Sequence, residues 1–482
     1  MNEIILPVSE LKSALPGFSK IIGRRSSLPV LEHIRFTRDA NGGVNLTATD
    51  LDSHAIYHVT KTQDGAPLDV LVPFEPLNKL VKGLGNQDVI QLTMDGKKQI
   101  HVKYPLAGSF MEQKLDTLPA DEFPPLPKIT KPGVLLGPEF GVAIKQALQC
   151  CLQNTSRPEL CGAYVDVSDK KLHYIVASNG TALFAANSFT FGLQKSVIIP
   201  DSKFLNWTDL MENGCQFAVE PPAKGSSQGF IQLASGRWTF ITRELDARFP
   251  HWKQSVPAMV DPTTVIRLSA QAVKQLLEVL PHLSGNEEVN RIIRLKYESQ
   301  QLKVEGRGKE VQWTGVFVQD ATITGKPITI GLNREYLITA LKFNLSEIQI
   351  EGPLTPLVCI NEGRKMVIMP VKLEFPLTAR PAPTTSPTTT TPAPKPEAER
   401  KTEMPKTTST TPKPEPPKPA EPSPTTSLID QVEQVKETLK NVIRDLTAVI
   451  DAVKLAEKEK RASEKEVESV RSTLKKLQQV TL

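Results

Sequence analysis

Residues 6–15 read LPVSELKSAL, and the same kind of segment returns as LGPEFGVAIKQAL at 136–148 and as LSAQAVKQLLEVL at 268–280. In each segment a leucine is followed by apolar residues three and four positions apart, which predicts an amphipathic helix. The three starting leucines are 130 and 132 residues apart. This period is much longer than the repeat of a solenoid, so it predicts three copies of a whole domain.

A second element has the same period. A strand-like run followed by a helical pattern occurs at 68–84, 195–211 and 326–343. Short strand-like pieces that end in turn residues lie between the two helical patterns of each copy, namely VNLTATDLD, HYIVASNG and LKVEGRG. Two helices and several short strands per copy predict an α+β fold.

The chain therefore divides into five predicted parts. The strand-like MVIMPVKL at 366–373 closes the third copy. The stretch after it is rich in proline and threonine and has almost nothing to bury, which predicts a disordered tether. The last part has apolar residues at heptad a and d positions, which predicts a coiled coil or helical hairpin; a single amphipathic helix that docks elsewhere is the alternative. The parts are 1–128, 129–257 and 258–375 for the three copies, 376–427 for the tether and 428–480 for the helical segment.

Composition narrows the classes of function. A formal net charge of +5 on 482 residues is too small for a polycation, so binding to nucleic acid would need charge placed on one face. We find no apolar run long enough to span a membrane and no signal-peptide pattern, so we expect a cytoplasmic protein without a membrane partner. The five cysteines lack metal-binding spacing and are expected to be reduced thiols.

Two catalytic patterns are also missing from the sequence. Neither an HExxH nor a P-loop pattern occurs, and the seven histidines are dispersed, so we expect no catalytic residue, cofactor or metal. Asp50 and Asp52 in the stretch ATDLD could ligate a metal. Without further ligands, capping of a turn is the favoured role for this pair.

The first 375 residues resemble the bacterial sliding clamp, the β subunit of DNA polymerase III. The matching stretches occur in the order of that family and cover nearly all of the three copies. They are RRSSLPVLEHIRF, LTATDLD, LDTLPADEFPPLP, VASNGTALFAA, ARFPHWKQSVP, GLNREYLITAL and MVIMPVKL. The chain after about residue 376 lies outside the resemblance, because such clamps usually end at the equivalent of Leu373.

The resemblance implies a homodimeric ring of two chains joined head to tail, with helices around a pore that encircles duplex DNA. Such a ring is not an enzyme; it tethers the replicative polymerase to DNA. Sliding needs weak, sequence-independent attraction to phosphates, which scattered basic and amide side chains on the repeated helices would supply. Arg25 occupies the position of a DNA-contacting arginine of the family. The expected DNA-binding residues are Lys12, Lys20, Arg24, Arg25, Lys79, Lys82, Lys145, Gln149, Arg157, Lys203, Lys274, Arg334 and Lys342.

The resemblance also implies a pocket between the second and third copies that accepts short apolar peptides of the polymerase and the clamp loader. The expected pocket residues are Leu160, Gly180, Leu183, Pro250, Asn333, Tyr336, Met369, Pro370, Val371 and Leu373, with Val256 and Leu354 as further candidates. Thr181-Ala182 and Gln254 replace basic residues common in the family, so the pocket is expected to be less basic. At the ring interface Leu283 fits an apolar role, whereas Gln113 stands where an aromatic residue is common.

One other function remains open at this point. A clamp paralogue or scaffold could keep the fold and use the coiled-coil tail to recruit partners, without a primary role in replication. The tail itself is expected to recruit a partner or to self-associate, because a flexible tether keeps its end near the ring at high effective concentration.

Overall fold

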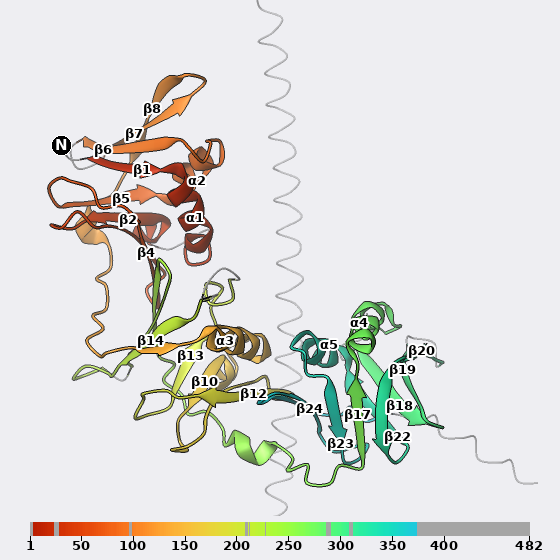
Figure 1. Cartoon of the computed structure of the whole chain (residues 1–482). Helices are drawn as coiled ribbons and strands as arrows, with labels where there is room; N and C mark the ends of the chain where they lie inside the picture. Colours follow the sequence, from red (N-terminus) through yellow and green to blue (C-terminus); the bar gives the residue numbers. More distant parts are fainter. Residues whose placement is uncertain are drawn as a thin grey trace, which may run out of the picture. The chain divides into compact units, whose positions relative to one another are not determined.

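The computed structural model describes residues 3–23, 28–95, 99–207, 211, 213–226, 228–285, 291–307 and 312–373. The predicted tether and helical segment lie outside the described residues, as do Arg24 and Arg25. Among the described residues the strands form four sheets, and five α-helices pack against them, which is the expected α+β composition (Figure 1).

Two outer sheets have four antiparallel strands each. The first has the order β1-β6-β7-β8 and the second has the order β20-β19-β18-β22. Their bounds are Glu3–Pro7 (β1), Val89–Asp95 (β6), Gln99–Leu106 (β7), Ser109–Asp116 (β8), Trp313–Phe317 (β20), Gln301–Arg307 (β19), Ile292–Glu298 (β18) and Ile328–Asn333 (β22).

The eight-stranded sheet joins the first copy of the repeat to the second. Its order is β5-β2-β3-β4-β16-β15-β14-β9, and the two copies meet where β4 pairs with β16 in antiparallel register, with Trp238 opposite Tyr57. The strands are Leu68–Pro73 (β5), His33–Arg38 (β2), Val44–Thr49 (β3), Ser53–His58 (β4), Trp238–Arg243 (β16), Phe230–Ser235 (β15), Cys215–Glu220 (β14) and Val134–Leu136 (β9).

The nine-stranded sheet joins the second copy to the third. Its order is β13-β10-β11-β12-β25-β24-β23-β17-β21, and the junction is the pairing of β12 with β25. The strands are Val197–Pro200 (β13), Gly162–Asp166 (β10), His173–Ser178 (β11), Ala182–Phe189 (β12), Arg364–Ile368 (β25), Leu357–Asn361 (β24), Glu347–Ile350 (β23), Thr264–Leu268 (β17) and Ala321–Gly325 (β21). The predicted closing strand at 366–373 is confirmed for residues 366–368, which belong to β25, while residues 369–373 lie beyond the strand.

The helix predicted at the start of each copy is confirmed in all three copies. The helices that open the copies are Val8–Phe18 (α1), Pro138–Cys150 (α3) and Ala270–Val279 (α4), and each follows the first strand of its copy. Ser269 caps α4 by accepting a hydrogen bond from the backbone of Ala272. Apolar side chains three and four positions apart, such as Leu11, Leu15 and Phe18 of α1, are buried in the core.

The second helix predicted for each copy is confirmed in two of the copies. These helices are Phe74–Lys82 (α2) and Arg334–Lys342 (α5). In the second copy the prediction was wrong for the described residues up to Trp207, because residues 203–206 form a turn. The Asn206 side chain donates hydrogen bonds to Asp201 Oδ1 at 2.8 Å and to the carbonyl of Ser202 at 3.1 Å. A short polar side chain that bonds nearby groups in this way favours a turn over a continued helix.

A cluster of aromatic rings packs α1 against the junction between the first two copies. The Trp238 ring lies 5.1 Å from that of Phe18 and 5.0 Å from that of Tyr57. Gly17 leaves room for this contact, because a Cβ at Gly17 would lie 2.6 Å from the Trp238 ring. A larger residue at position 17 would push the helix off the sheet.

A buried carboxylate ties the same helix to the β15–β16 turn. Glu10 accepts hydrogen bonds from Tyr57 at 2.7 Å and Thr60 at 2.5 Å, and Arg237 Nη1 lies 2.7 Å from its Oε2. Burial raises the pKa of Glu10, but the hydrogen bonds from Thr60 and Tyr57 and the charge of Arg237 outweigh it, so the pKa lies below its usual value. The ionised form is therefore the one that the fold stabilises.

This network predicts a specific pH dependence. A carboxylate whose pKa is lower in the folded chain stabilises it above the unfolded pKa, and this stabilisation is lost as the pH falls through the folded value. In denaturant unfolding, the free energy of unfolding of the wild-type chain should exceed that of Glu10→Gln. This difference should be largest at pH 7. The difference should shrink as the pH falls below about 4.3, the ordinary glutamate value. A difference that stays constant down to acid pH would contradict the role of the ionised Glu10.

Candidate functional site

Each α-helix has a stripe of exposed or half-buried positions that carries a basic residue or an amide. In α2 the exposed positions Glu75, Lys79 and Lys82 are four and three residues apart, which places them on one face. In α4 the exposed residues Gln271, Lys274 and Glu278 follow the same spacing. The stripes also hold Lys20 just beyond α1, half-buried Lys145 and exposed Gln149 on α3, and exposed Lys342 on α5.

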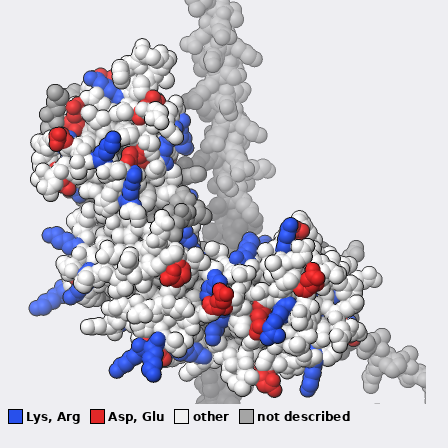
Figure 2. All heavy atoms as spheres, viewed as in Figure 1, with Lys and Arg blue, Asp and Glu red and all other residues white. Residues whose placement is uncertain are grey.

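Charge is not concentrated on these helices. Lys and Arg are interspersed with Asp and Glu over the face of the molecule drawn in Figure 2. Lys12 of α1 is partly buried, and its ammonium donates to the carbonyl of Leu84 at 2.6 Å. Lys203 is exposed, but it lies in the turn after β13. The helices therefore offer separate positive charges, a pattern that attracts phosphate without fixing a register.

Arg334 contradicts its assignment as a DNA-binding residue. It is the first residue of α5 and is fully buried. Its guanidinium donates to the carbonyls of Leu283 at 2.6 Å and Leu280 at 3.2 Å, and also to that of Ser284. Arg334 therefore holds the loop after α4 against α5 and cannot reach a ligand. Leu283 is also buried, within the core of its own chain, so it does not fit the apolar role at a ring interface.

A pocket of about 530 Å³ lies beside the junction of β12 with β25 and is called the junction pocket below. Five of the predicted pocket residues line it: Leu160, Gly180, Leu183, Pro250 and Met369. Arg157, which we expected at DNA, also lines this pocket, where it forms an ion pair with Glu159 at 3.2 Å. The lining is mostly apolar with a few polar groups, the composition of a site that binds a short peptide.

Trp252 and Phe249 form an aromatic wall of the junction pocket, and residues behind them hold them in place. Trp252 donates its indole N–H to Asp166 at 2.8 Å, and the Phe249 ring stacks on that of Tyr164 at 4.6 Å. Burial raises the pKa of Asp166, but hydrogen bonds from Ser168 and Trp252 and the charge of Lys253 hold it below its usual value. The carboxylate is therefore ionised and orients the indole. No local sequence pattern indicates this support, because 86 residues separate the two partners.

The other predicted pocket residues lie elsewhere. The Tyr336 hydroxyl contacts Thr181 Oγ1 at 2.6 Å and so adjoins the rim of the pocket, while Asn333 caps α5. Val371 and Leu373 line a second pocket of about 590 Å³ together with Leu354. The residue between the two sites, Pro370, is half-buried. The resemblance had assigned all of these residues to one site, whereas Val371 and Leu373 line a second pocket and neither Asn333 nor Pro370 lines either pocket.

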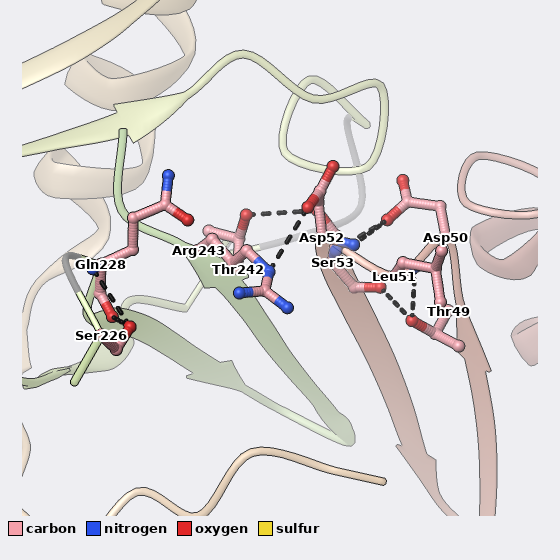
Figure 3. A network of polar contacts seen from close by, with 9 residues as sticks. All are labelled: Thr49, Asp50, Leu51, Asp52, Ser53, Ser226, Gln228, Thr242 and Arg243. Carbon is pink, nitrogen blue, oxygen red and sulfur yellow. Dashed lines mark hydrogen bonds and ion pairs between the residues drawn. The ribbon is translucent and has the colours of Figure 1, made fainter. Parts of the chain in front are cut away.

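The stretch ATDLD forms a turn, as predicted (Figure 3). Asp50 Oδ1 accepts hydrogen bonds from the backbone of Asp52 at 3.2 Å and Ser53 at 2.6 Å. Leu51 has a φ of +83°, a conformation that the capped turn supports. Asp52 instead reaches β16, where its carboxylate lies 3.4 Å from Arg243 Nε. Asp50 thus caps the turn, and Asp52 links the turn to the second copy at the junction. No group of three or more metal-ligating side chains occurs among the described residues.

Each outer sheet has one covered edge and one edge without a partner strand in the described residues. The Gln63 side chain covers the β1 edge, accepting from the N–H of Ile5 at 3.0 Å and donating to its carbonyl. The segment after β25 covers part of the β22 edge, since the N–H of Val371 donates to Gly331 at 2.8 Å. The remaining edges are β8 and β20. Phe110 on β8 is 81% exposed and Phe317 on β20 is 48% exposed, so both edges offer apolar surface to another chain.

In the part of the chain that the structure describes, no helix is long and apolar enough to cross a membrane.

Known proteins share both sequence and fold with this chain. Residues 3–127 match the family model of the DNA polymerase III beta subunit, N-terminal domain. The beta sliding clamp of Escherichia coli K12 is 24% identical over 389 residues, which cover 75% of this chain and 98% of the clamp. That of Pseudomonas putida is 25% identical over 73% of this chain and 95% of the clamp. The crystal structure of the beta subunit from DNA polymerase of Streptococcus pyogenes covers 77% of this chain and all of its own, with a TM-score of 0.67 at 18% identity.

Proposed function

Since residues 1–375 are related to the bacterial sliding clamps, the β subunits of DNA polymerase III, we propose that this chain is a DNA sliding clamp. Two copies form a ring around duplex DNA and confer processivity on the replicative polymerase. The role is not catalytic. The observation that carries the proposal is the return of an exposed or half-buried Lys on a helix of every copy of the repeat: Lys79 and Lys82 on α2, Lys145 on α3, Lys274 on α4 and Lys342 on α5. No observation favours a scaffold without a role in replication.

We assign the DNA contacts to the exposed or half-buried basic and amide groups of the helices and turns. A ring that slides needs contacts that are individually weak and that read no bases. Arg24 and Arg25 remain proposed contacts on the strength of the resemblance alone. The full set is Lys20, Arg24, Arg25, Lys79, Lys82, Lys145, Gln149, Lys203, Lys274 and Lys342.

Neutralising the stripe of α2 tests this assignment. The double variant Lys79→Gln/Lys82→Gln should bind DNA less tightly and reduce the slope of log affinity against log salt by about 2, because each phosphate contact releases about one counterion. The matched control is Lys170→Gln/Lys171→Gln, which removes the same charge from an exposed loop. Equal slopes for the two variants would show that α2 makes no phosphate contact.

The junction pocket is the proposed docking site for apolar peptides of the polymerase and the clamp loader. Met369 stands at its edge with 48% of its surface exposed, so Met369→Asp should fold normally and still place a charge in the pocket. We expect affinity for a fluorescent peptide from the polymerase to fall about 30-fold or more, the loss typical of a hot-spot residue. Val260→Asp, at a 90% exposed position outside the pocket lining, should bind as the wild type does. Retained affinity in Met369→Asp would place the peptide elsewhere.

Ring closure would use the two sheet edges that have no partner strand among the described residues. We propose that β8 of one chain pairs with β20 of the next, in both directions around the dimer. Antiparallel pairing would continue each outer sheet across the interface, and it would bury Phe110 and Phe317.

The remaining parts of the proposal rest on the sequence. We propose that the three domains are 1–128, 129–257 and 258–375, and that the ring acts at the nucleoid in the cytoplasm. The Pro/Thr-rich stretch 376–427 would serve as a disordered tether. The segment 428–480 would form a coiled coil that recruits a partner or self-associates near the ring.

A further inference from the structure

The second pocket lies at the end of the described chain. It is formed by the β22 edge, the turn after β23 and the last residues, Val371–Leu373, and is called the terminal pocket below. Leu354 in that turn is 66% exposed, and its neighbours Pro353 and Pro327 are exposed as well. The pocket thus offers apolar surface at the point where residues 374–482 begin.

The chain enters this pocket alongside the β22 edge, to which one backbone hydrogen bond joins it. The N–H of Val371 donates to the carbonyl of Gly331 at 2.8 Å. A Cβ at Gly331 would lie 2.5 Å from the carbonyl oxygen of Val371 and 2.6 Å from Leu373 Cδ2. Glycine at this position therefore lets the added segment lie flat on the strand. Lys326–Thr329 also line the terminal pocket, so the β22 edge continues beyond Gly331 alongside it.

The next residues keep the pattern of that strand. From Val371 to Leu377 the sequence VKLEFPL alternates apolar and other residues, with the apolar ones at the odd positions. Alternate residues of a strand point to the same face, so Phe375 and Leu377 would follow Val371 and Leu373 into the terminal pocket. Phe375 and Leu377 are also the last large apolar residues of the sequence before Met404.

Pro376 fits the same register. The N–H of Val371 points to β22, so those of residues 373, 375 and 377 would point there too, while the even positions face away. Proline has no N–H and is tolerated in an edge strand where that group would face solvent. A proline at an odd position would have prevented this pairing.

We propose that residues 374–377 extend the added strand along β22 and fill the terminal pocket with Phe375 and Leu377. The tail is then anchored on β22, a few residues after Met369 of the junction pocket. Val371, Leu373 and Leu354 become covered by the chain itself, so the junction pocket alone is left for partner peptides. This inference concerns one chain and stands independently of the ring and of DNA binding.

Amide hydrogen exchange of the full-length chain, followed by mass spectrometry, tests the anchor. The amides of Phe375 and Leu377 should exchange about tenfold or more slowly relative to those of residues 385–395, because hydrogen bonds to β22 protect them. Leu354→Asp, which charges the exposed apolar wall, and Phe375→Ser/Leu377→Ser, which removes both apolar side chains, should each abolish this protection. Leu135→Asp, at an 82% exposed position on β9, is the matched control and should leave it intact.

Other occupants of the terminal pocket give different results. The proposal would be overturned if the amides of Phe375 and Leu377 in the wild type exchanged as fast as those of residues 385–395. Protection that grows with protein concentration would assign the pocket to a second copy, and protection that appears only with the polymerase peptide would assign it to a partner. Both of these outcomes would also overturn it.

Discussion

Replacing Arg334 by alanine should lower the free energy of unfolding by roughly 3–5 kcal/mol, because the change leaves a cavity and several buried carbonyls without donors. The side chain is fully buried and donates to carbonyls of the loop after α4. Urea unfolding, followed by circular dichroism, measures the loss. Arg334→Lys should fall between the wild type and alanine, since an ammonium keeps the charge but cannot reproduce the guanidinium fork.

The control for Arg334 is the other end of the same helix. Lys342 is exposed, so Lys342→Ala should change the free energy of unfolding by no more than about 0.5 kcal/mol and should weaken DNA binding. If Arg334→Ala were as stable as the wild type and bound DNA less tightly, the structural role derived from its burial would be wrong.

A charge on the open edge of the first outer sheet should abolish the ring. Phe110→Asp places a carboxylate where β8 is proposed to meet β20 of the next chain, and position 110 is exposed enough to accept it without loss of stability. We expect the dissociation constant of the dimer to rise about 100-fold or more, because a desolvated charge without a partner costs several kcal/mol.

Sedimentation velocity at micromolar concentration measures that change, and Leu135→Asp on β9 provides a control with an equally exposed leucine. Phe110→Asp should sediment as a monomer and Leu135→Asp as a dimer. A dimeric Phe110→Asp would place the interface on other strands.

The repeat could be predicted from the sequence because it depends on local patterns. Apolar spacing located α1, α3 and α4, and strand-like runs followed by helical patterns located α2 and α5. In the middle copy residues 203–206 form a turn where a helix was predicted, and the Asn206 side chain stabilises it through bonds to Asp201 and Ser202 that a hydrophobic pattern does not register.

The site was harder to predict, because a basic residue type does not reveal what its side chain contacts. Lys342 and Arg334 are both basic residues of α5, yet one is exposed and the other binds carbonyls about 50 residues away. The support of Trp252 by Asp166 is likewise a contact between distant segments. Family resemblance located the pocket region. Only the structure shows that Leu160 and Met369 line the junction pocket, whereas Val371 and Leu373 line the terminal pocket.

The central claim is that two copies of this chain close around DNA, and retention on circular DNA tests it most directly. The purified protein would be loaded onto a nicked circular plasmid with a clamp loader, washed in high salt and then released by linearising the plasmid. We predict that it stays on the circle through the wash and leaves only after the cut, because a closed ring is held by topology while salt weakens electrostatic binding. Release by salt alone, with the plasmid still circular, would contradict the account.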